Sequence, residues 1–188
     1  MDLSLDPGKT ALVAIDLQKG ILANPSGPNG GAIVVANVAR MAEALRAKGG
    51  FVVLVHVGPL DGGDALHPVT DNPPNRWTPG PDWVDIDPSL LPHASLIIRK
   101  RQWGAFYGTE LDLQLRRRGI DTIVLCGIST SMGVESTARD AFERGYNQVF
   151  VEDAMSAMTA EEHANVVKTT FPRLGRIRTT EDVLGALK

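Results

Sequence analysis

A loop of small residues near the middle of the chain has the composition of an anion-binding site. Residues 127–133 read Gly-Ile-Ser-Thr-Ser-Met-Gly, directly after the apolar run 122–126 and directly before a segment with helical spacing. The N–H groups of such a loop and the positive end of the helix dipole both favour negative charge. We therefore expect the Ser129 and Gly133 N–H groups to cradle an anion, with Gly133 in the catalytic site and Ser129, Thr130 and Met132 as substrate contacts.

A carboxyl group follows the first apolar run of the chain. Asp16 comes directly after residues 11–15, and Gln18 lies two positions further on. Burial at the end of such a run raises the pKa of a carboxyl group and suits it to general acid or base catalysis. The alternative is a helix cap or a charge held by loop N–H groups. We take Asp16 as a candidate catalytic residue and Gln18 as a candidate substrate contact.

A basic and aromatic segment follows another apolar run. Residues 99–109 read Arg-Lys-Arg-Gln-Trp-Gly-Ala-Phe-Tyr-Gly-Thr. Charge runs are often solvated turns, which is one interpretation. The other is that Lys100 lines a pocket whose rings exclude water and receive a flat substrate. In that case Lys100 is catalytic, and the substrate contacts are Arg101, Trp103 and Phe106.

The elements that must position these residues alternate along the chain. Apolar runs predict strands at 11–15, 51–55, 95–98, 122–126, 147–151 and, as an edge strand, 174–178. Helical spacing or capping predicts helices at 33–48, 109–118, 159–170, 180–187 and one containing 134–142. Thr109 is the expected N-cap of the second helix, and Thr159 with Glu162 has the spacing of a capping box.

This alternation predicts an α/β fold of three layers, with a mostly parallel six-stranded sheet between helices. Ligands bind beyond the carboxyl ends of the strands in such sheets. Asp16, Lys100 and the 127–133 loop all follow predicted strands, so we expect them to meet at one edge. The irregular stretch 58–91 contains Trp77 and Trp83; it is either a lid, a binding segment, a subunit contact or a linker.

Length and composition narrow the class of protein. The 188 residues fit a single domain spanning 1–188, and the net charge of −3 gives no basic surface for nucleic acid. We expect no membrane span, because no apolar run is long enough, and no secretory signal, because the start lacks a basic and then apolar stretch. One cysteine excludes an intrachain disulfide. We expect a cytoplasmic protein with a small-molecule substrate and no membrane partner.

Three segments together resemble the isochorismatase-like hydrolase superfamily. They are Ile15-Asp16-Leu17-Gln18, then Lys100 with Ala105-Phe106-Tyr107-Gly108-Thr109, then Gly127-Ile128-x-Thr130-x-x-Gly133-Val134-x-x-Thr137-Ala138. The resemblance covers nearly the whole chain and is especially close to short bacterial isochorismatase-family hydrolases. It implies a parallel sheet of about six strands, and a homo-oligomer, a dimer or a tetramer.

The resemblance also implies roles for the site residues. Amidases of this superfamily use an Asp, a Lys and a nucleophilic Cys, with a non-proline cis peptide beside the oxyanion site. Asp16 and Lys100 match the first two, the cis bond corresponds to Ile128–Ser129, and Gly133 occupies the position of the cysteine. Cys126, the only thiol, lies inside an apolar run, where we expect it to pack in the core.

The isochorismatases of the superfamily also have glycine at that position. Their aspartic acid protonates a vinyl ether, water adds, and pyruvate leaves without a covalent intermediate. We therefore expect a cysteine-free hydrolase of a small cyclic or unsaturated molecule. The alternatives are a catalytically silent binding protein, and an amidase with an unrecognised nucleophile such as Ser129 or Ser131.

Charge and metal requirements complete the expectations. Isochorismate carries two carboxylates, for which Arg76 and Arg101 are candidate partners. Some members of the superfamily bind zinc through an Asp-x-His pair, and that spacing is absent around His56. We expect no metal and no cofactor, and a packed or hydrogen-bonded role for His56.

Overall fold

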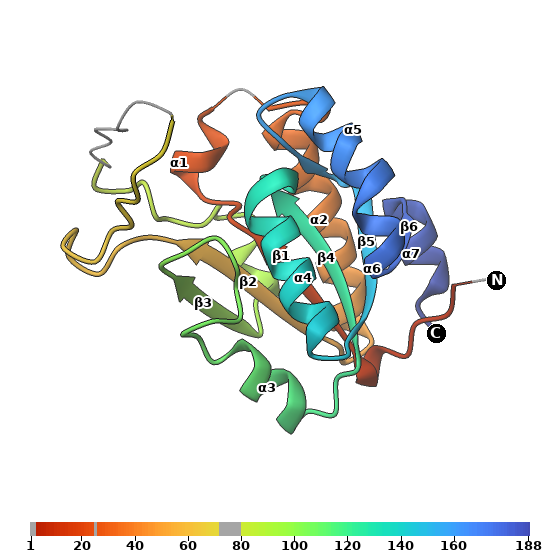
Figure 1. Ribbon diagram of the computed structural model, residues 1–188. Helices are drawn as coiled ribbons and strands as arrows, with labels where there is room; N and C mark the ends of the chain where they lie inside the picture. Colours follow the sequence, from red (N-terminus) through yellow and green to blue (C-terminus); the bar gives the residue numbers. More distant parts are fainter. Residues whose placement is uncertain (1–2, 25, 72–79) are drawn as a thin grey trace.

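The computed structural model describes residues 3–24, 26–71 and 80–188, which form a six-stranded sheet with helices on both faces (Figure 1). The sheet order is β3-β2-β1-β4-β5-β6, and every neighbouring pair is parallel. The strands are β1 (Thr10–Ile15), β2 (Phe51–Val57), β3 (Leu96–Lys100), β4 (Thr122–Ile128), β5 (Asn147–Ser156) and β6 (Arg176–Arg178).

The helices divide between the two faces of the sheet. In Figure 1, α4 lies in front of the sheet and α2 behind it. The helices are α1 (Lys19–Leu22), α2 (Gly31–Ala47), α3 (Leu111–Arg117), α4 (Glu135–Glu143), α5 (Ala160–Thr169), α6 (Phe171–Leu174) and α7 (Thr180–Ala186). Three single turns complete the set: η1 (Pro7–Lys9), η2 (Leu91–His93) and η3 (Thr130–Val134), the last a π-helical turn.

Two apolar cores explain this layering. The helices α3, α4, α5 and α6 bury one set of side chains against one face, including Leu111, Ala138, Val166 and Phe171. The helices α2 and α7 bury another set against the other face, including Val34, Val38, Met41 and Val183. Every residue of β1 is buried, as its continuous apolar sequence requires when helices cover both faces. The predicted three-layer α/β/α fold is confirmed.

Several strand and helix boundaries differ from those predicted from sequence. The structure extends β5 to Ser156, five residues beyond the predicted end at Val151, across an irregular pairing with β4. The predicted edge strand 174–178 shortens to β6 because α6 occupies residues up to Leu174. The N-cap of α3 is Glu110 rather than Thr109, whose hydroxyl instead donates to the Ala105 carbonyl at 2.6 Å and accepts from the Leu111 N–H.

The capping box predicted at the start of α5 is only half formed. The Thr159 hydroxyl accepts from the Glu162 N–H at 3.1 Å, as predicted. The Glu162 carboxylate does not return to Thr159; it accepts a hydrogen bond from the Ser131 hydroxyl of η3 at 3.2 Å. The start of α5 is therefore tied to the loop that follows β4.

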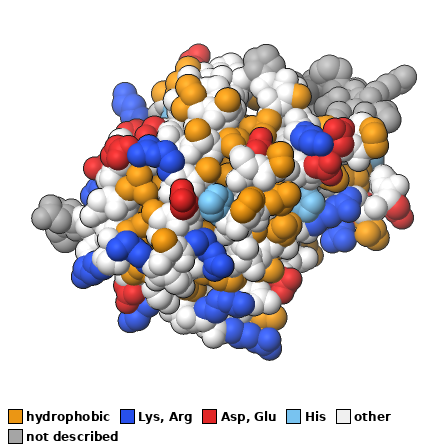
Figure 2. Space-filling view, turned by 180° about the vertical axis from the view of Figure 1, so that it is seen from behind, with side chains coloured by type: hydrophobic (Ala, Val, Ile, Leu, Met, Phe, Trp, Pro, Cys, Tyr) orange, Lys and Arg blue, Asp and Glu red, His pale blue; other side chains and the backbone are white. Residues whose placement is uncertain are grey.

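The rear of the molecule carries a mixed surface. Figure 2 shows Lys and Arg side chains among acidic, apolar and uncharged ones on this face. Within the described part of the chain, no helix combines the length and the apolar character that crossing a membrane needs.

Candidate active site

The carboxyl ends of three strands bring the catalytic candidates together. Asp16 follows β1, Lys100 is the last residue of β3, and Gly133 lies in η3 after β4. Lys100 Nζ donates to Asp16 Oδ2 at 2.8 Å. A Cβ atom added to Gly133 would lie 3.0 Å from Asp16 Oδ2 and 3.4 Å from Lys100 Nζ. The three positions predicted from separate segments therefore share one site.

Asp16 has an unusual backbone conformation. Its φ angle is +55°, and it is the one non-glycine residue with a positive φ in the described chain. Its N–H donates to the Val55 carbonyl of β2 at 2.8 Å, which holds this turn against the sheet. Non-glycine residues with positive φ are uncommon and concentrate at functional sites. The turn places the Asp16 carboxyl group beside the Lys100 ammonium group.

Lys100 is almost completely buried, with 1% of its surface exposed. Its ammonium group donates to Asp16 Oδ2, to the Gln102 carbonyl at 3.2 Å and to the Trp103 carbonyl at 2.7 Å. A lysine ammonium group has three donors, and all three are used. The last residue of β3 thus supplies the cation, and the segment that follows supplies the carbonyl groups that make its burial tolerable.

The protonation of Asp16 depends on two opposed effects. Burial favours the neutral acid, whereas the charge of Lys100 and its hydrogen bond favour the carboxylate. Burial is the larger effect and raises the pKa of Asp16 from 3.8 to about 6. Oδ1 is buried and has no hydrogen-bond partner among the described residues, so it is the oxygen that can hold the proton of the neutral acid.

The loop after β4 approaches β1 closely. The peptide bond between Ile128 and Ser129 is cis, as the resemblance predicts. Gly127 has a φ of +118°, and a Cβ atom there would lie 2.1 Å from the carbonyl oxygen of Ile15. Only glycine allows this approach. The loop therefore brings Ser129 and Gly133 beside the turn that carries Asp16.

These residues line a pocket of about 630 Å³, within the range of small-molecule sites. Of the predicted substrate contacts, Trp103, Ser129 and Met132 lie in its wall with Asp16, Lys100 and Gly133. The other main lining residues were not predicted from sequence; they are Ile21, Asn24, Ser26, Val57, Trp83, Ile128 and Met158. Most are apolar and lack a chemical signature; Trp83, an aromatic residue in the long irregular segment, was the one visible signal.

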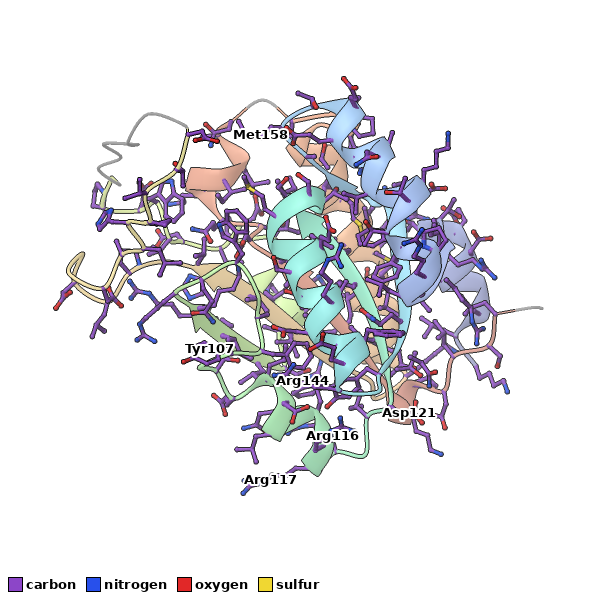
Figure 3. The ribbon with its side chains drawn as sticks, viewed as in Figure 1. Tyr107, Arg116, Arg117, Asp121, Arg144 and Met158 are labelled. Carbon is purple, nitrogen blue, oxygen red and sulfur yellow. The ribbon has the colours of Figure 1, made fainter. Side chains whose placement is uncertain are left out.

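Figure 3 helps to locate the pocket. Met158, which lines it, lies beside α1 at the upper end of the sheet, whereas Arg116 and Asp121 lie at the opposite end. Tyr107 lies away from Met158 and is 77% exposed, so this ring of the aromatic segment does not enclose the site. The pocket thus opens at the carboxyl edge of the sheet, where the fold predicts a ligand.

Two predicted substrate contacts are instead structural supports. Gln18 is fully buried; its side-chain amide donates to the carbonyls of Val57 and Trp83 and accepts from the Val57 N–H. Thr130 is fully buried, and its hydroxyl is 2.9 Å from His163 Nδ1. Neither lines the pocket. The expectation is corrected because both side chains satisfy buried partners behind the pocket wall.

Two further predicted contacts face elsewhere. Phe106 is 4% exposed and packs in the core, 5.9 Å from the Tyr146 ring and under the Arg144 guanidinium. Arg101 pairs with Asp64 at 2.9 Å in the neighbouring long segment. Neither residue lines the pocket. Residues adjacent in the 99–109 segment therefore point to different environments, which their types alone do not reveal.

The remaining candidates fall outside the pocket or outside the described residues. Cys126 is fully buried, and burial raises the pKa of its thiol, so its predicted core role is confirmed. His56 is half-buried and its Nδ1–H donates to the Val84 carbonyl at 2.7 Å, as a hydrogen-bonded histidine. Arg76 and Trp77 lie outside the described residues. The described residues contain no cluster of His, Cys, Asp and Glu suited to a metal ion.

Comparison with known proteins identifies the class that this fold and site define. The isochorismatase domain model matches residues 10–182, and the chain belongs to the isochorismatase family. It is 50% identical over 190 residues to the uncharacterized isochorismatase family protein YwoC of Bacillus subtilis, covering 99% of this chain and 98% of YwoC. It is 30% identical over 182 residues to the ureidoacrylate amidohydrolase RutB of Methylobacterium radiotolerans, covering 81% of this chain and 69% of RutB.

A solved structure supports the same assignment. The structure of an isochorismatase family protein from Burkholderia thailandensis superposes with a TM-score of 0.92 at 46% identity, covering 99% of this chain and 98% of that one. The family thus includes hydrolases such as the RutB amidohydrolase. The particular reaction of this chain depends on its own site residues.

Proposed function

We propose that this protein hydrolyses a small, mostly apolar molecule by general-acid catalysis from Asp16, without a covalent intermediate. The observation that carries the proposal is the position of Gly133 beside the Asp16–Lys100 pair. A glycine has no nucleophilic side chain, and the only thiol is buried in the core. The raised pKa of Asp16, about 6, suits an acid that must hold a proton near neutral pH.

Each residue of the pair has a distinct role in this mechanism. Asp16 donates its proton from Oδ1, the oxygen that has no other partner among the described residues. Lys100 stabilises the carboxylate that remains, through the 2.8 Å hydrogen bond to Oδ2. In a vinyl ether the proton adds to the methylene carbon, water adds to the oxocarbenium ion, and the resulting hemiketal releases an alcohol and a carbonyl product.

The pocket wall favours an uncharged substrate. Among its described lining residues, Lys100 is the only cation, and its three donors are already used. Arg101, one candidate partner for a carboxylate, is paired with Asp64 instead. The rings of Trp83 and Trp103 and the side chains of Ile21 and Met132 offer apolar surface. A flat apolar molecule with one or two polar groups fits this lining better than a dicarboxylate.

Amide hydrolysis is the second candidate function. The similarity to an amidohydrolase favours it, and Ser129, a hydroxyl-bearing residue, lines the pocket. In that case Ser129 is the nucleophile and an acyl-enzyme forms. The remaining alternative is a catalytically silent binding protein, which has the same pocket but no turnover. In that case wild type and Asp16→Ala are equally inactive.

A substrate screen with a trapping step tests the proposal. Isochorismate, neutral vinyl ethers, nicotinamide and ureidoacrylate are incubated with the wild type and with Asp16→Asn, and acid-quenched samples are weighed by intact-mass spectrometry. We expect turnover of a neutral vinyl ether that Asp16→Asn loses, with no mass adduct on the chain. A covalent adduct on Ser129 establishes the amidase instead, and absence of turnover across the panel favours the binding protein. The expected homo-oligomer stays a prediction for size-exclusion chromatography with light scattering.

A further inference from the structure

A chain of three side chains runs from the pocket to the start of α5. Ser129 lines the pocket; its Oγ lies 3.3 Å from Ser131 Oγ, and Ser131 Oγ donates to Glu162 Oε2 at 3.2 Å. We infer that Glu162, acting through Ser131, sets Ser129 as a hydrogen-bond acceptor that takes a proton from the attacking water. This inference rests on the proposed hydrolysis and adds a base to it.

The local fold holds Glu162 in this position. The Thr159 hydroxyl caps the Glu162 N–H, while the Glu162 carboxylate turns away from Thr159 to Ser131. One residue along each segment, the buried Thr130 hydroxyl contacts Nδ1 of the buried His163 at 2.9 Å. Two adjacent contacts therefore hold η3 against α5.

The number of hydroxyl hydrogens fixes which residue donates in each hydrogen bond between Ser129, Ser131 and Glu162. A carboxylate only accepts hydrogen bonds, so the single hydrogen of Ser131 is used on Glu162. Ser129 must then be the donor in its contact with Ser131. The Ser129 hydroxyl has no second hydrogen, so it presents lone pairs to the pocket. It accepts a hydrogen bond from water or from a substrate N–H or O–H, and it does not donate to a substrate carbonyl.

This direction suits the removal of a proton from water. As the water oxygen bonds to the electrophilic carbon of the substrate, its O–H bond breaks and the proton passes to Ser129 Oγ. The Ser129 proton passes to Ser131 Oγ, and the Ser131 proton passes to Glu162 Oε2. Each hydroxyl loses one proton and gains one, and a neutral glutamic acid results. Glu162 is partly exposed, so it releases the proton to solvent.

The catalytic pair does not offer an equivalent route. The Lys100 ammonium group has no lone pair to accept a proton. Water adds only after Asp16 has given up its proton, and the Asp16 carboxylate that remains is held by the Lys100 ammonium group, whose charge and hydrogen bond lower its basicity. A separate acceptor takes the proton of the water without drawing on this pair. General-base assistance of this kind contributes about 10²–10⁴-fold to a rate.

The first test compares two glutamates in the same turn of α5. Glu162→Gln keeps the size of the side chain and removes its ability to take a proton. Glu161→Gln makes the same charge change at an exposed neighbour that takes no part in the hydrogen bonds from Ser129 to Glu162. We expect Glu162→Gln to lower kcat by about 10²-fold with KM nearly unchanged, because Glu162 does not touch the substrate. Glu161→Gln should match the wild type; equal kcat values for the two variants overturn the inference.

The second test does not require turnover. Neutron diffraction from wild-type crystals in D2O locates the deuterium on Ser129 Oγ. We expect it between Ser129 and Ser131, and a deuterium that points into the pocket overturns the inference. If the wild type hydrolyses none of the panel, the proposed function fails, and this measurement still decides the direction of the chain.

Discussion

Lys100 and Asp16, 84 residues apart in the sequence, form a 2.8 Å hydrogen-bonded ion pair that is almost fully buried beneath the pocket. A pair in this position adds little net stability, because removing two charges from water offsets most of their attraction. The pair is better explained by chemistry than by folding. It holds a carboxyl group in an apolar wall and keeps a cation ready for the carboxylate that forms when the proton leaves.

The first prediction concerns pH. In the proposed mechanism the acid form of Asp16 is the active one, and its fraction falls as the pH rises through the pKa of about 6. We expect kcat/KM to be highest at acidic pH and to fall nearly tenfold per pH unit above about pH 6. Asp16→Asn, which has the same shape and no proton to give, should be inactive at every pH. A flat profile from about pH 5 to pH 8, with Asp16→Asn active, would contradict the general-acid role.

The second prediction concerns the stability of the pair. Lys100→Met removes the cation and leaves the Asp16 carboxyl group buried without it. The pKa of Asp16 then rises further, because only burial acts on it. A folded pKa above the unfolded value lowers stability progressively as the pH rises towards it. We expect the free energy of unfolding to fall below wild type by about 3–5 kcal/mol above that pKa, and by less at about pH 5.

Chemical denaturation at two pH values measures this difference, and an exposed lysine provides the control. Lys19 contacts Asp82 and Asp85 at 3.2 Å each, with about half of its side chain exposed. Lys19→Met should change stability little and equally at both pH values, because exposed ion pairs contribute little. A Lys100→Met deficit that does not vary with pH would show that the pKa of Asp16 is the same in the variant as in the wild type, which contradicts the prediction.

The sheet and the meeting of the candidate catalytic positions were predictable from sequence for a simple reason. Long apolar runs become strands when both faces of a sheet are covered, and residues at their carboxyl ends meet at one edge. Asp16, Lys100 and Gly133 each follow such a run. Their convergence therefore depends on topology alone and needs no knowledge of side-chain packing.

The rest of the pocket depends on packing that the sequence does not display. Gln18 and Phe106 lie near catalytic residues in the chain, but their side chains satisfy partners behind the wall. Trp83 reaches the pocket through contacts with the turn after β1, including the 3.0 Å hydrogen bond from the Gly20 N–H to its carbonyl. Glu162 has the spacing of a capping residue, and only the fold shows that Ser131 takes its carboxylate.

The third prediction follows from the contact between Gly20 and Trp83. A Cβ atom on Gly20 would lie 1.8 Å from the Trp83 ring, so Gly20→Ala must displace the indole from the pocket wall. We expect KM to rise with a smaller change in kcat, because the Asp16–Lys100 pair is not moved. Steady-state kinetics and tryptophan fluorescence measure the two effects. Gly30→Ala is the matched control, since a Cβ atom there meets nothing within 4 Å; equal KM values for the two variants would rule out a substrate contact by Trp83.

The fourth prediction concerns the position that lacks a nucleophile. Gly133→Cys places its Cβ atom beside Asp16 Oδ2 and Lys100 Nζ, where the nearby ammonium group lowers the pKa of a thiol. We expect iodoacetamide to label the variant once and to leave the wild type unlabelled, because Cys126 is buried and its thiol donates to the Val13 carbonyl.

Acid-catalysed turnover should fall in Gly133→Cys and equally in Gly133→Ala, since either side chain crowds the carboxyl group at 3.0 Å. Rapid labelling of native wild type with loss of activity would instead make Cys126 the functional thiol and would show that the loop after β4 is wrongly aligned.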